Sequence, residues 1–390
     1  MPFDQARLAR IDRHLAKYVD DGRLPGWQVQ VALHGEVVHA GTYGLADVEA
    51  GRPVADDTLW RIYSMTKPLT SVLAMMLWEE GEFQLTDEVS RWIPSFADAK
   101  VFDKGSATSP FLVPAVEPIR VWHLLTHAAG LTYGFMQHHP VDAIYRAHGF
   151  EFSWPAGYDL AAACDAWARL PLKSQPGTAF GYGVATDVLG RVIEVITGKR
   201  LDEAMHERIL GPLGMTDTRW WVEGADVERL AGLYAAIEGK AIRYDVLGGA
   251  ALREPTGHSG GGGLISTAAD YQRFMNALLD GSLLAPRTLQ LMTKNHLPGD
   301  LAQCNSGGFA ETVLDGIGFG LGFAVVMDPV PARSASSVGE YYWGGLASTA
   351  FWIDPTTGVT ASFYTQLVPS STYPIRAELR QLVYSALMDG

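Results

Sequence analysis

The chain has 390 residues, of which 47% are hydrophobic and 19% are charged, as is ordinary for a globular protein. Its formal net charge of −13 argues against nucleic acid and anionic membrane surfaces as partners, because both attract basic patches. The sequence shows neither an apolar run long enough to span a membrane nor the apolar core of a secretion signal, so we expect a cytoplasmic protein.

The first part of the chain predicts a helix, a hairpin and a second helix. We expect the first helix over about 4–20, and alternating residues over 27–33 and 36–40 around a His34-Gly35 turn predict the hairpin. An apolar face at i, i+3, i+4, i+7 and i+8 begins at Leu69 and predicts a helix that stops near Gly81.

The middle of the chain is expected to form mainly helices and loops, and the last part mainly strands. The expected helices of the middle lie over 121–127, 186–196 and 201–210. After a glycine run come a helix over 267–280, one strand over 341–353, a turn over 354–358, a partner strand over 359–367 and a helix over 374–388.

These elements predict an α/β fold of the α+β type with two domains. Residues 1–85 and 256–390 would form an α/β domain whose antiparallel sheet is built from both chain ends and flanked by helices. Residues 86–255 would form a mainly helical domain, and the functional site would lie between the two domains.

Ser64-x-x-Lys67 is the clearest candidate for chemistry, because it opens the helix that runs to Gly81. Residues three apart on a helix point the same way, so Lys67 would stand one turn from Ser64 and could accept its proton. A weak nucleophile needs such an adjacent base, and the helix dipole favours developing negative charge at this end. The alternative is an N-cap serine followed by a solvated lysine.

Two glycine-flanked aromatic residues follow downstream. Tyr182 stands between Gly181 and Gly183 just before a predicted helix, and glycines let backbone approach a ligand closely. Trp343-Gly344-Gly345 lies on the predicted long strand, where glycine weakens pairing unless something must approach the backbone. An acyl group held against that strand would be such a thing.

In this order and at these separations, Ser64-x-x-Lys67, Tyr182 and Trp343-x-Gly345 resemble the three signature elements of the family VIII carboxylesterases. These are serine esterases built on the class C β-lactamase and penicillin-binding-protein fold. The stretches 124–131, 260–267 and 351–355 are similar too, so the resemblance spans nearly the whole chain. It implies a β-lactamase/transpeptidase-like fold.

The resemblance also implies roles for individual residues. Ser64 matches the nucleophile, Lys67 the residue that eases its deprotonation, and Tyr182 the tyrosine that carries protons to the leaving group and activates the deacylating water. The backbone N–H groups of Ser64 and Leu346 match the oxyanion hole. Whether Lys67 or Tyr182 takes the serine proton stays open. The expected substrate-binding residues are Trp343, Gly344, Gly345, Val184 and Tyr133.

The chain departs from the β-lactamase pattern at two places. The lactamase Tyr-x-Asn element has Val184 here as its third residue, and Val184 cannot hydrogen-bond a lactam side-chain amide. The lactamase Lys-Thr-Gly element is Trp343-Gly344-Gly345 here, which removes a cation for a substrate carboxylate. Both changes favour uncharged esters.

Several other patterns are interpreted as structural. Ser259 lies in a Gly-x-Ser-x-Gly sequence, but no apolar strand precedes it and further glycines follow, so a glycine-rich turn is expected. His123 and His127 could share a helix face, yet no glutamate follows His123, so both are expected to pack. Trp220-Trp221 is expected to pack as well. The distant Cys164 and Cys304 are expected to be buried thiols.

We therefore expect a serine hydrolase that cleaves small-molecule carboxylic esters of short to medium acyl chains through an acyl-enzyme. No cofactor, no metal and no nucleic-acid or membrane partner is expected, and the oligomeric state stays open. The alternatives are an acyltransferase on the same fold, a weak β-lactamase, and a non-catalytic penicillin-recognising domain.

Overall fold

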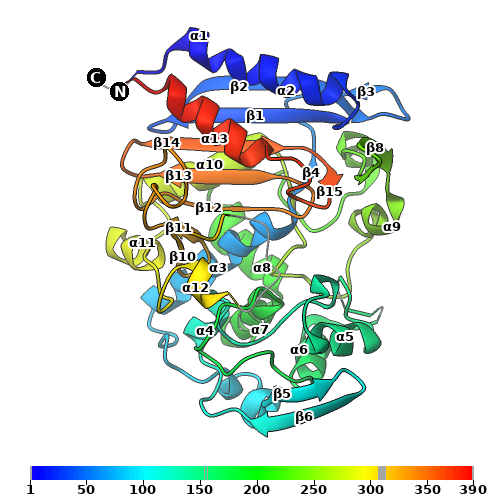
Figure 1. Ribbon diagram of the computed structural model, residues 1–390, viewed down its shortest axis with the longest axis vertical. Coiled ribbons are helices and arrows are strands. Elements are labelled where there is room, and N and C mark those ends of the chain that lie inside the picture. Colours follow the sequence, from blue (N-terminus) through cyan, green and yellow to red (C-terminus); the bar gives the residue numbers. More distant parts are fainter. Residues whose placement is uncertain (1, 153, 156, 306–312, 389–390) are drawn as a thin grey trace.

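The computed structural model describes residues 2–152, 154–155, 157–305 and 313–388. Among these residues the largest element is an eight-stranded antiparallel sheet in the order β10-β11-β12-β13-β14-β1-β2-β3 (Figure 1). Its strands are β1 (Gly26–Leu33), β2 (Glu36–Asp47), β3 (Arg52–Pro53), β10 (Ile317–Phe319), β11 (Ala324–Val326), β12 (Tyr341–Gly344), β13 (Ala350–Asp354) and β14 (Val359–Tyr364). Both ends of the chain meet where β1 pairs with β14, with Val31 opposite Ala361.

Helices cover both faces of this sheet. On one face lie α1 (Gln5–Leu8), α2 (Arg10–Asp20) and α13 (Ile375–Ala386), and on the other lies α10 (Ala268–Leu279) (Figure 1). Successive side chains of β1 point to opposite faces of the sheet. Gln30 contacts Gln272 of α10, whereas Val29 and Val31 are fully buried in the core. The central strands β13 and β14 are consequently buried along their whole length.

The remainder of the chain is mainly helical, and most of it lies below the sheet in Figure 1, with α9 and α11 beside the sheet. Its helices include α3 (Thr66–Glu79), α4 (Val121–Leu125), α5 (Pro140–Ala147), α6 (Leu160–Trp167), α7 (Ala185–Thr197), α8 (Leu201–Met205), α9 (Asp245–Gly248), α11 (Pro286–Met292) and α12 (Leu301–Cys304). No helix within the described ranges is long and apolar enough to cross a membrane. Cys164 and Cys304 are buried free thiols.

Short strands also occur outside the main sheet, and the sequence did not predict those of the middle region. A hairpin pairs β5 (Lys100–Ser106) with β6 (Ser109–Pro114), and β7 (Tyr234–Ile237) lies between β8 (Lys240–Arg243) and β15 (Leu367–Val368). A further pair joins β4 (Trp60–Arg61) to β9 (Ile265–Ser266). The division into domains of 1–85 with 256–390 and of 86–255 stays a prediction.

One predicted element is wrong: the single strand over 341–353 is two antiparallel strands, β12 and β13. The chain reverses between them over 345–349, where Ser348 has a left-handed φ of 67° and the N–H of Gly345 donates to the carbonyl of Thr349. The aromatic residues on either side gave a continuous strand pattern that hid this turn. The reversal places Leu346 at a tight corner rather than on a flat sheet.

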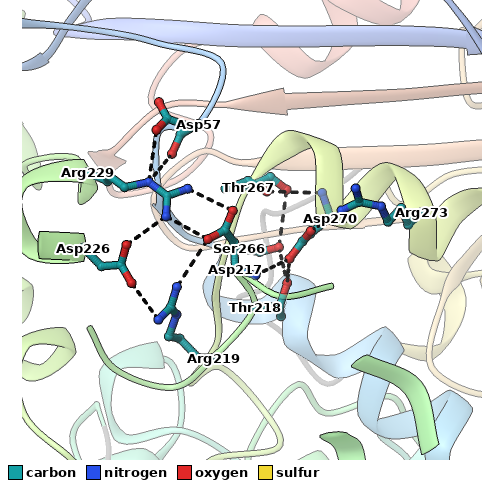
Figure 2. A network of polar contacts seen from close by, with 10 residues as sticks. All are labelled: Asp57, Asp217, Thr218, Arg219, Asp226, Arg229, Ser266, Thr267, Asp270 and Arg273. Atoms are coloured by element: carbon teal, nitrogen blue, oxygen red, sulfur yellow. Dashed lines mark hydrogen bonds and ion pairs between the residues drawn. The ribbon is translucent and has the colours of Figure 1, made fainter. Parts of the chain in front are cut away.

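An ionic network fixes the segment that precedes β7 to the start of α10 (Figure 2). The Arg229 guanidinium donates two hydrogen bonds, of 2.8 and 2.9 Å, to the two carboxylate oxygens of Asp217 and another to Asp226. The backbone N–H of Asp217 donates to Asp270 in the first turn of α10, over 2.8 Å. This network anchors the loop between Asp217 and Asp226, which carries Trp220.

Arg229→Met is expected to lower the free energy of unfolding by about 2 kcal/mol, because it strips a two-pronged charged hydrogen bond from a partly buried carboxylate. Hydrogen bonding to Arg229 lowers the pKa of Asp217 from its ordinary 3.8, so this stabilisation is present above that value and is lost as the pH falls through the lowered pKa. Urea unfolding of both proteins at neutral pH and below about pH 4 checks this, since the difference should shrink in acid.

Arg273→Met is the matched control for this prediction. Arg273 belongs to the same network through Asp270, but its side chain is half exposed and the pair lies within one helix turn. Such pairs contribute little to stability. An equal loss in both variants would contradict a special role for the Arg229–Asp217 pair.

Candidate active site

Ser64 lies in a tight turn, Tyr63–Met65, immediately before α3. Tyr63 has a left-handed φ of 43°, which a bulky residue rarely adopts, and its ring packs against a buried cluster of Leu233, Ala347 and Val368. Surrounding packing therefore holds a strained backbone next to Ser64, as is common at functional sites. Ser64 lines a cavity, and it lies just before α3, where the sequence predicted the start of a helix.

Lys67 is only 2% exposed and directs its ammonium group at several acceptors. Its Nζ lies 3.2 Å from Ser64 Oγ, as the i, i+3 spacing predicted. The same Nζ donates to the hydroxyl of Tyr133 over 3.0 Å and to the backbone carbonyl of Gly261 over 2.6 Å. The lysine is thus fixed in place beside the candidate nucleophile.

Tyr182 and Trp343 pack beside this lysine, with their ring centres 5.4 Å apart and their planes tilted by 50°. Lys67 Nζ lies 4.6 Å from the centre of the Tyr182 ring, and the Trp343 indole N–H donates to the Tyr182 hydroxyl over 3.3 Å. The indole also packs edge-on against Phe319. Lys67, Tyr182 and Trp343 are not among the described residues that line the cavity, and a substrate contact by Trp343 stays a prediction.

Tyr133 approaches the lysine more closely than its predicted role as a substrate contact suggested. Its hydroxyl accepts from Lys67, and its ring meets that of Tyr182 at 5.6 Å. Burial, with a smaller effect of Asp187, raises the pKa of Tyr133 well above its ordinary value. The site therefore holds two tyrosines next to one lysine, and no signal in the sequence distinguishes Tyr133 as one of them.

The two candidate oxyanion-hole residues, Ser64 and Leu346, both line the cavity. In the described part of the chain, neither of their backbone N–H groups donates to a protein acceptor. Gly345 allows this corner to approach the Ser64 turn, because a Cβ there would lie 2.4 Å from the carbonyl oxygen of Ile62. Both N–H groups are thus left available for a substrate oxygen.

Gly344 and Gly345 were also predicted to contact substrate. The structure shows a packing reason why neither position can carry a side chain. A Cβ on Gly344 would lie 2.5 Å from the Arg376 guanidinium, which donates to the carbonyls of Gly345 and Thr349. Neither glycine is among the described cavity residues. A substrate contact by either glycine stays a prediction.

The cavity in front of Ser64 has a volume of about 390 Å³ and largely aromatic walls. Phe135 stacks between the rings of Tyr133 and Phe152, with interplanar angles of 17° and 14°. Val184 lines the cavity, and its predicted contact with substrate stays a prediction. Further aromatic side chains of the wall are Tyr63, Phe150, Trp154, Trp167 and Trp220, so Trp220, which was expected to pack, also lines the cavity.

The patterns interpreted as structural take part in packing and hydrogen bonding. Ser259 lies in a turn, where its hydroxyl donates to the Asp187 carboxylate over 2.6 Å. Burial lowers the pKa of His123 to about 4, and its Nδ1 accepts from the Arg120 backbone N–H. His127 packs against Tyr182 at 4.8 Å. Within the described ranges, no three His, Cys, Asp or Glu side chains gather as metal ligands.

Comparison with known proteins agrees with this geometry. A family model described as Beta-lactamase matches residues 11–385, and Esterase EstB of Burkholderia gladioli is 31% identical over 98% of this chain and 97% of its own. Protein Rv1367c of Mycobacterium tuberculosis is 35% identical over 90% of this chain and 88% of its own. The solved structure of EstCE1, described as a hydrolase with promiscuous acyltransferase activity, matches with a TM-score of 0.84 and 28% identity, covering 97% of this chain and 99% of the other.

The chain therefore belongs to the beta-lactamase family, in which it is a family VIII carboxylesterase, a serine hydrolase that uses this fold. The resemblance and the fold class predicted from the sequence are both confirmed. The matches cover nearly the full length of each relative, so they concern the whole described chain and not one motif.

Proposed function

We propose that the protein hydrolyses small-molecule carboxylic esters through an acyl-enzyme on Ser64. The observation that carries this is the Lys67 Nζ at 3.2 Å from Ser64 Oγ, beside a cavity lined by Ser64 and Leu346. Among the described residues, the backbone N–H groups of these two residues donate to no protein acceptor. Ser64 Oγ attacks the ester carbonyl and its proton passes into the Lys67–Tyr182 pair. The carbonyl oxygen becomes an oxyanion that the N–H groups of Ser64 and Leu346 stabilise.

The proton taken from Ser64 then passes to the leaving alcohol, which completes acylation, and a water-dependent step follows. Tyr182, held by the Trp343 indole N–H, delivers a proton to the departing alcohol as the tetrahedral intermediate collapses. A water then attacks the Ser64 acyl ester and gives up its proton to the same pair. As the C–Oγ bond breaks and the acid leaves, the pair returns that proton to Ser64 Oγ. Tyr133 also contacts Lys67, so it belongs to the same proton network.

The cavity supports uncharged substrates with an apolar body. Val184 and the aromatic side chains make part of the wall apolar, and about 390 Å³ exceeds the space that an acetyl group fills. Short to medium acyl chains are therefore proposed for the acyl side, with room for a larger apolar alcohol. The cytoplasmic location stays a prediction from the sequence.

An acyltransferase is the second candidate, because EstCE1 is described as a hydrolase with promiscuous acyltransferase activity. In that reaction an alcohol replaces water as the acceptor of the Ser64 acyl group. Adding a competing alcohol to the ester assay and measuring transesterified product separates the two. A non-catalytic role is disfavoured by the assembled Ser64–Lys67 pair.

Esters are expected to be far better substrates than cephalosporins. A cephalosporin carboxylate meets no lysine from the third motif here, and an unpaired buried charge costs about 3 kcal/mol, or roughly 10²-fold in kcat/KM. The checking measurement compares kcat/KM for p-nitrophenyl butyrate and for nitrocefin.

Comparable values for the two substrates would contradict this selectivity. They would point to Arg253, a cation that also lines the cavity, as the partner of the carboxylate. In that case Arg253→Met would lower nitrocefin turnover more than butyrate turnover. With the expected selectivity, the variant affects both weakly and similarly.

A further inference from the structure

Asp187 is a buried carboxylate that the proposed mechanism leaves unused. It lies in the first turn of α7, is 3% exposed and borders the cavity. One of its oxygens, Oδ1, accepts from the Ser259 hydroxyl over 2.6 Å and from the Gly261 backbone N–H over 3.0 Å. Burying a carboxylate is costly unless something compensates its charge, so this position calls for a partner.

Gly261 connects this carboxylate to the active lysine. The Gly261 carbonyl accepts from Lys67 Nζ over 2.6 Å, while its N–H is held by Asp187. A Cβ on Gly261 would lie 2.5 Å from Asp187 Oδ2 and 3.1 Å from the Tyr133 hydroxyl. Asp187 therefore contacts Gly261 directly, and Gly261 is the residue whose carbonyl holds the Lys67 ammonium group.

The charges around this point are few. Burial raises the pKa of Asp187, and attraction to Lys67 is the largest effect that opposes the rise. The other titratable groups facing the pair are Tyr133, Tyr182, His127 and the Cys164 thiol, and the pKa shifts of Tyr133, His127 and Cys164 all favour their neutral forms. Asp187 and Lys67 are thus the two groups whose opposite charges compensate each other here.

We propose that Asp187 is a positioning residue that acts through Lys67. Its carboxylate anchors the 259–261 turn, whose Gly261 carbonyl holds Lys67 Nζ against Ser64 Oγ, and its negative charge sets the protonation state in which the lysine works. This proposal rests on the proposed esterase function. It also gives Ser259 a role: its hydroxyl supports the carboxylate.

The sign of the effect does not depend on which group takes the serine proton. Removing the negative charge disfavours the Lys67 ammonium and favours a Tyr182 phenolate, so the free base forms at lower pH in either case. Asp187→Asn keeps an acceptor for Ser259 and Gly261 but loses the charge. We expect its acid limb of kcat/KM to move about one pH unit lower than in the wild type.

Two variants separate charge from anchoring. Ser259→Ala removes one hydrogen bond but keeps the carboxylate, so its acid limb should coincide with that of the wild type. Asp187→Glu also keeps the charge while displacing the turn, so it should lower kcat with the limb in its wild-type position. Asp187→Ser replaces Asp187→Asn if the asparagine variant fails to fold, which circular dichroism reports.

The experiment measures kcat/KM for p-nitrophenyl butyrate between about pH 5 and pH 10, together with the rate of fluorophosphonate labelling of Ser64 over the same range. A shift in Asp187→Asn that is absent in Ser259→Ala supports the proposal. An unshifted limb in Asp187→Asn, or an equal shift in both variants, overturns it. A wild-type enzyme that neither labels at Ser64 nor turns over the ester overturns the proposed function instead.

Discussion

Ser64→Ala is expected to lower ester turnover by roughly 10⁴–10⁶-fold, because it removes the atom that forms the acyl-enzyme. The fold should be unaffected, since Ser64 lies on a turn whose conformation is held by the packing of Tyr63. The measurement is kcat for p-nitrophenyl butyrate, with a thermal melt to confirm folding.

Labelling with a fluorophosphonate locates the nucleophile directly. The wild type should carry the adduct on Ser64, and Ser64→Ala should not be labelled. Ser259→Ala is the matched control, because Ser259 also borders the cavity but hydrogen-bonds the Asp187 carboxylate, whereas Ser64 contacts Lys67. An adduct mapped to Ser259 would mean that the glycine-rich turn holds the nucleophile.

Lys67→Ala and Tyr182→Phe are each expected to lower kcat by roughly 10³–10⁴-fold, and the double variant should be little worse than either single variant. The reason is that the two side chains act as one unit, with the ammonium 4.6 Å from the Tyr182 ring and 3.2 Å from Ser64 Oγ. Steady-state kinetics of the three variants check this. Losses that multiply cleanly would show that the residues act independently.

Tyr133→Phe provides the comparison within this site. The Tyr133 hydroxyl contacts Lys67 at 3.0 Å, but burial disfavours its phenolate. We expect a smaller loss, roughly 10-fold to 10²-fold, from a less well held lysine. A loss as large as that of Tyr182→Phe would place Tyr133 on the path of the proton.

Local chemistry made part of the site predictable from the sequence. Ser64 and Lys67 lie on one stretch of helix, so their 3.2 Å contact follows from helical spacing alone. The same holds for the start of α10, where Thr267 accepts from the Asp270 N–H, and for the left-handed φ of 81° at Gly81 that follows α3. The flanking glycines singled out Tyr182, but its role and the choice of Leu346 came from the resemblance to a known family.

Only the tertiary structure decided which distant residues meet. Lys67, Tyr133, Asp187 and Gly261 come from four separate segments, and no spacing along the chain encodes their contacts. The turn between β12 and β13 was hidden because aromatic residues continue the strand pattern on both sides of it.

The part played by Trp343 was likewise decided by packing. Its indole N–H reaches the Tyr182 hydroxyl, a contact between residues far apart in the sequence, and its predicted contact with substrate stays a prediction. The aromatic side chains of the cavity come from segments as far apart as Phe135 and Trp220, and no regular spacing in the sequence predicts that they meet.

The sequence by itself determined the local nucleophile and its lysine, because a helix fixes neighbours three residues apart. The cavity, the second tyrosine and the buried Asp187 depended on the folding of remote segments against one another.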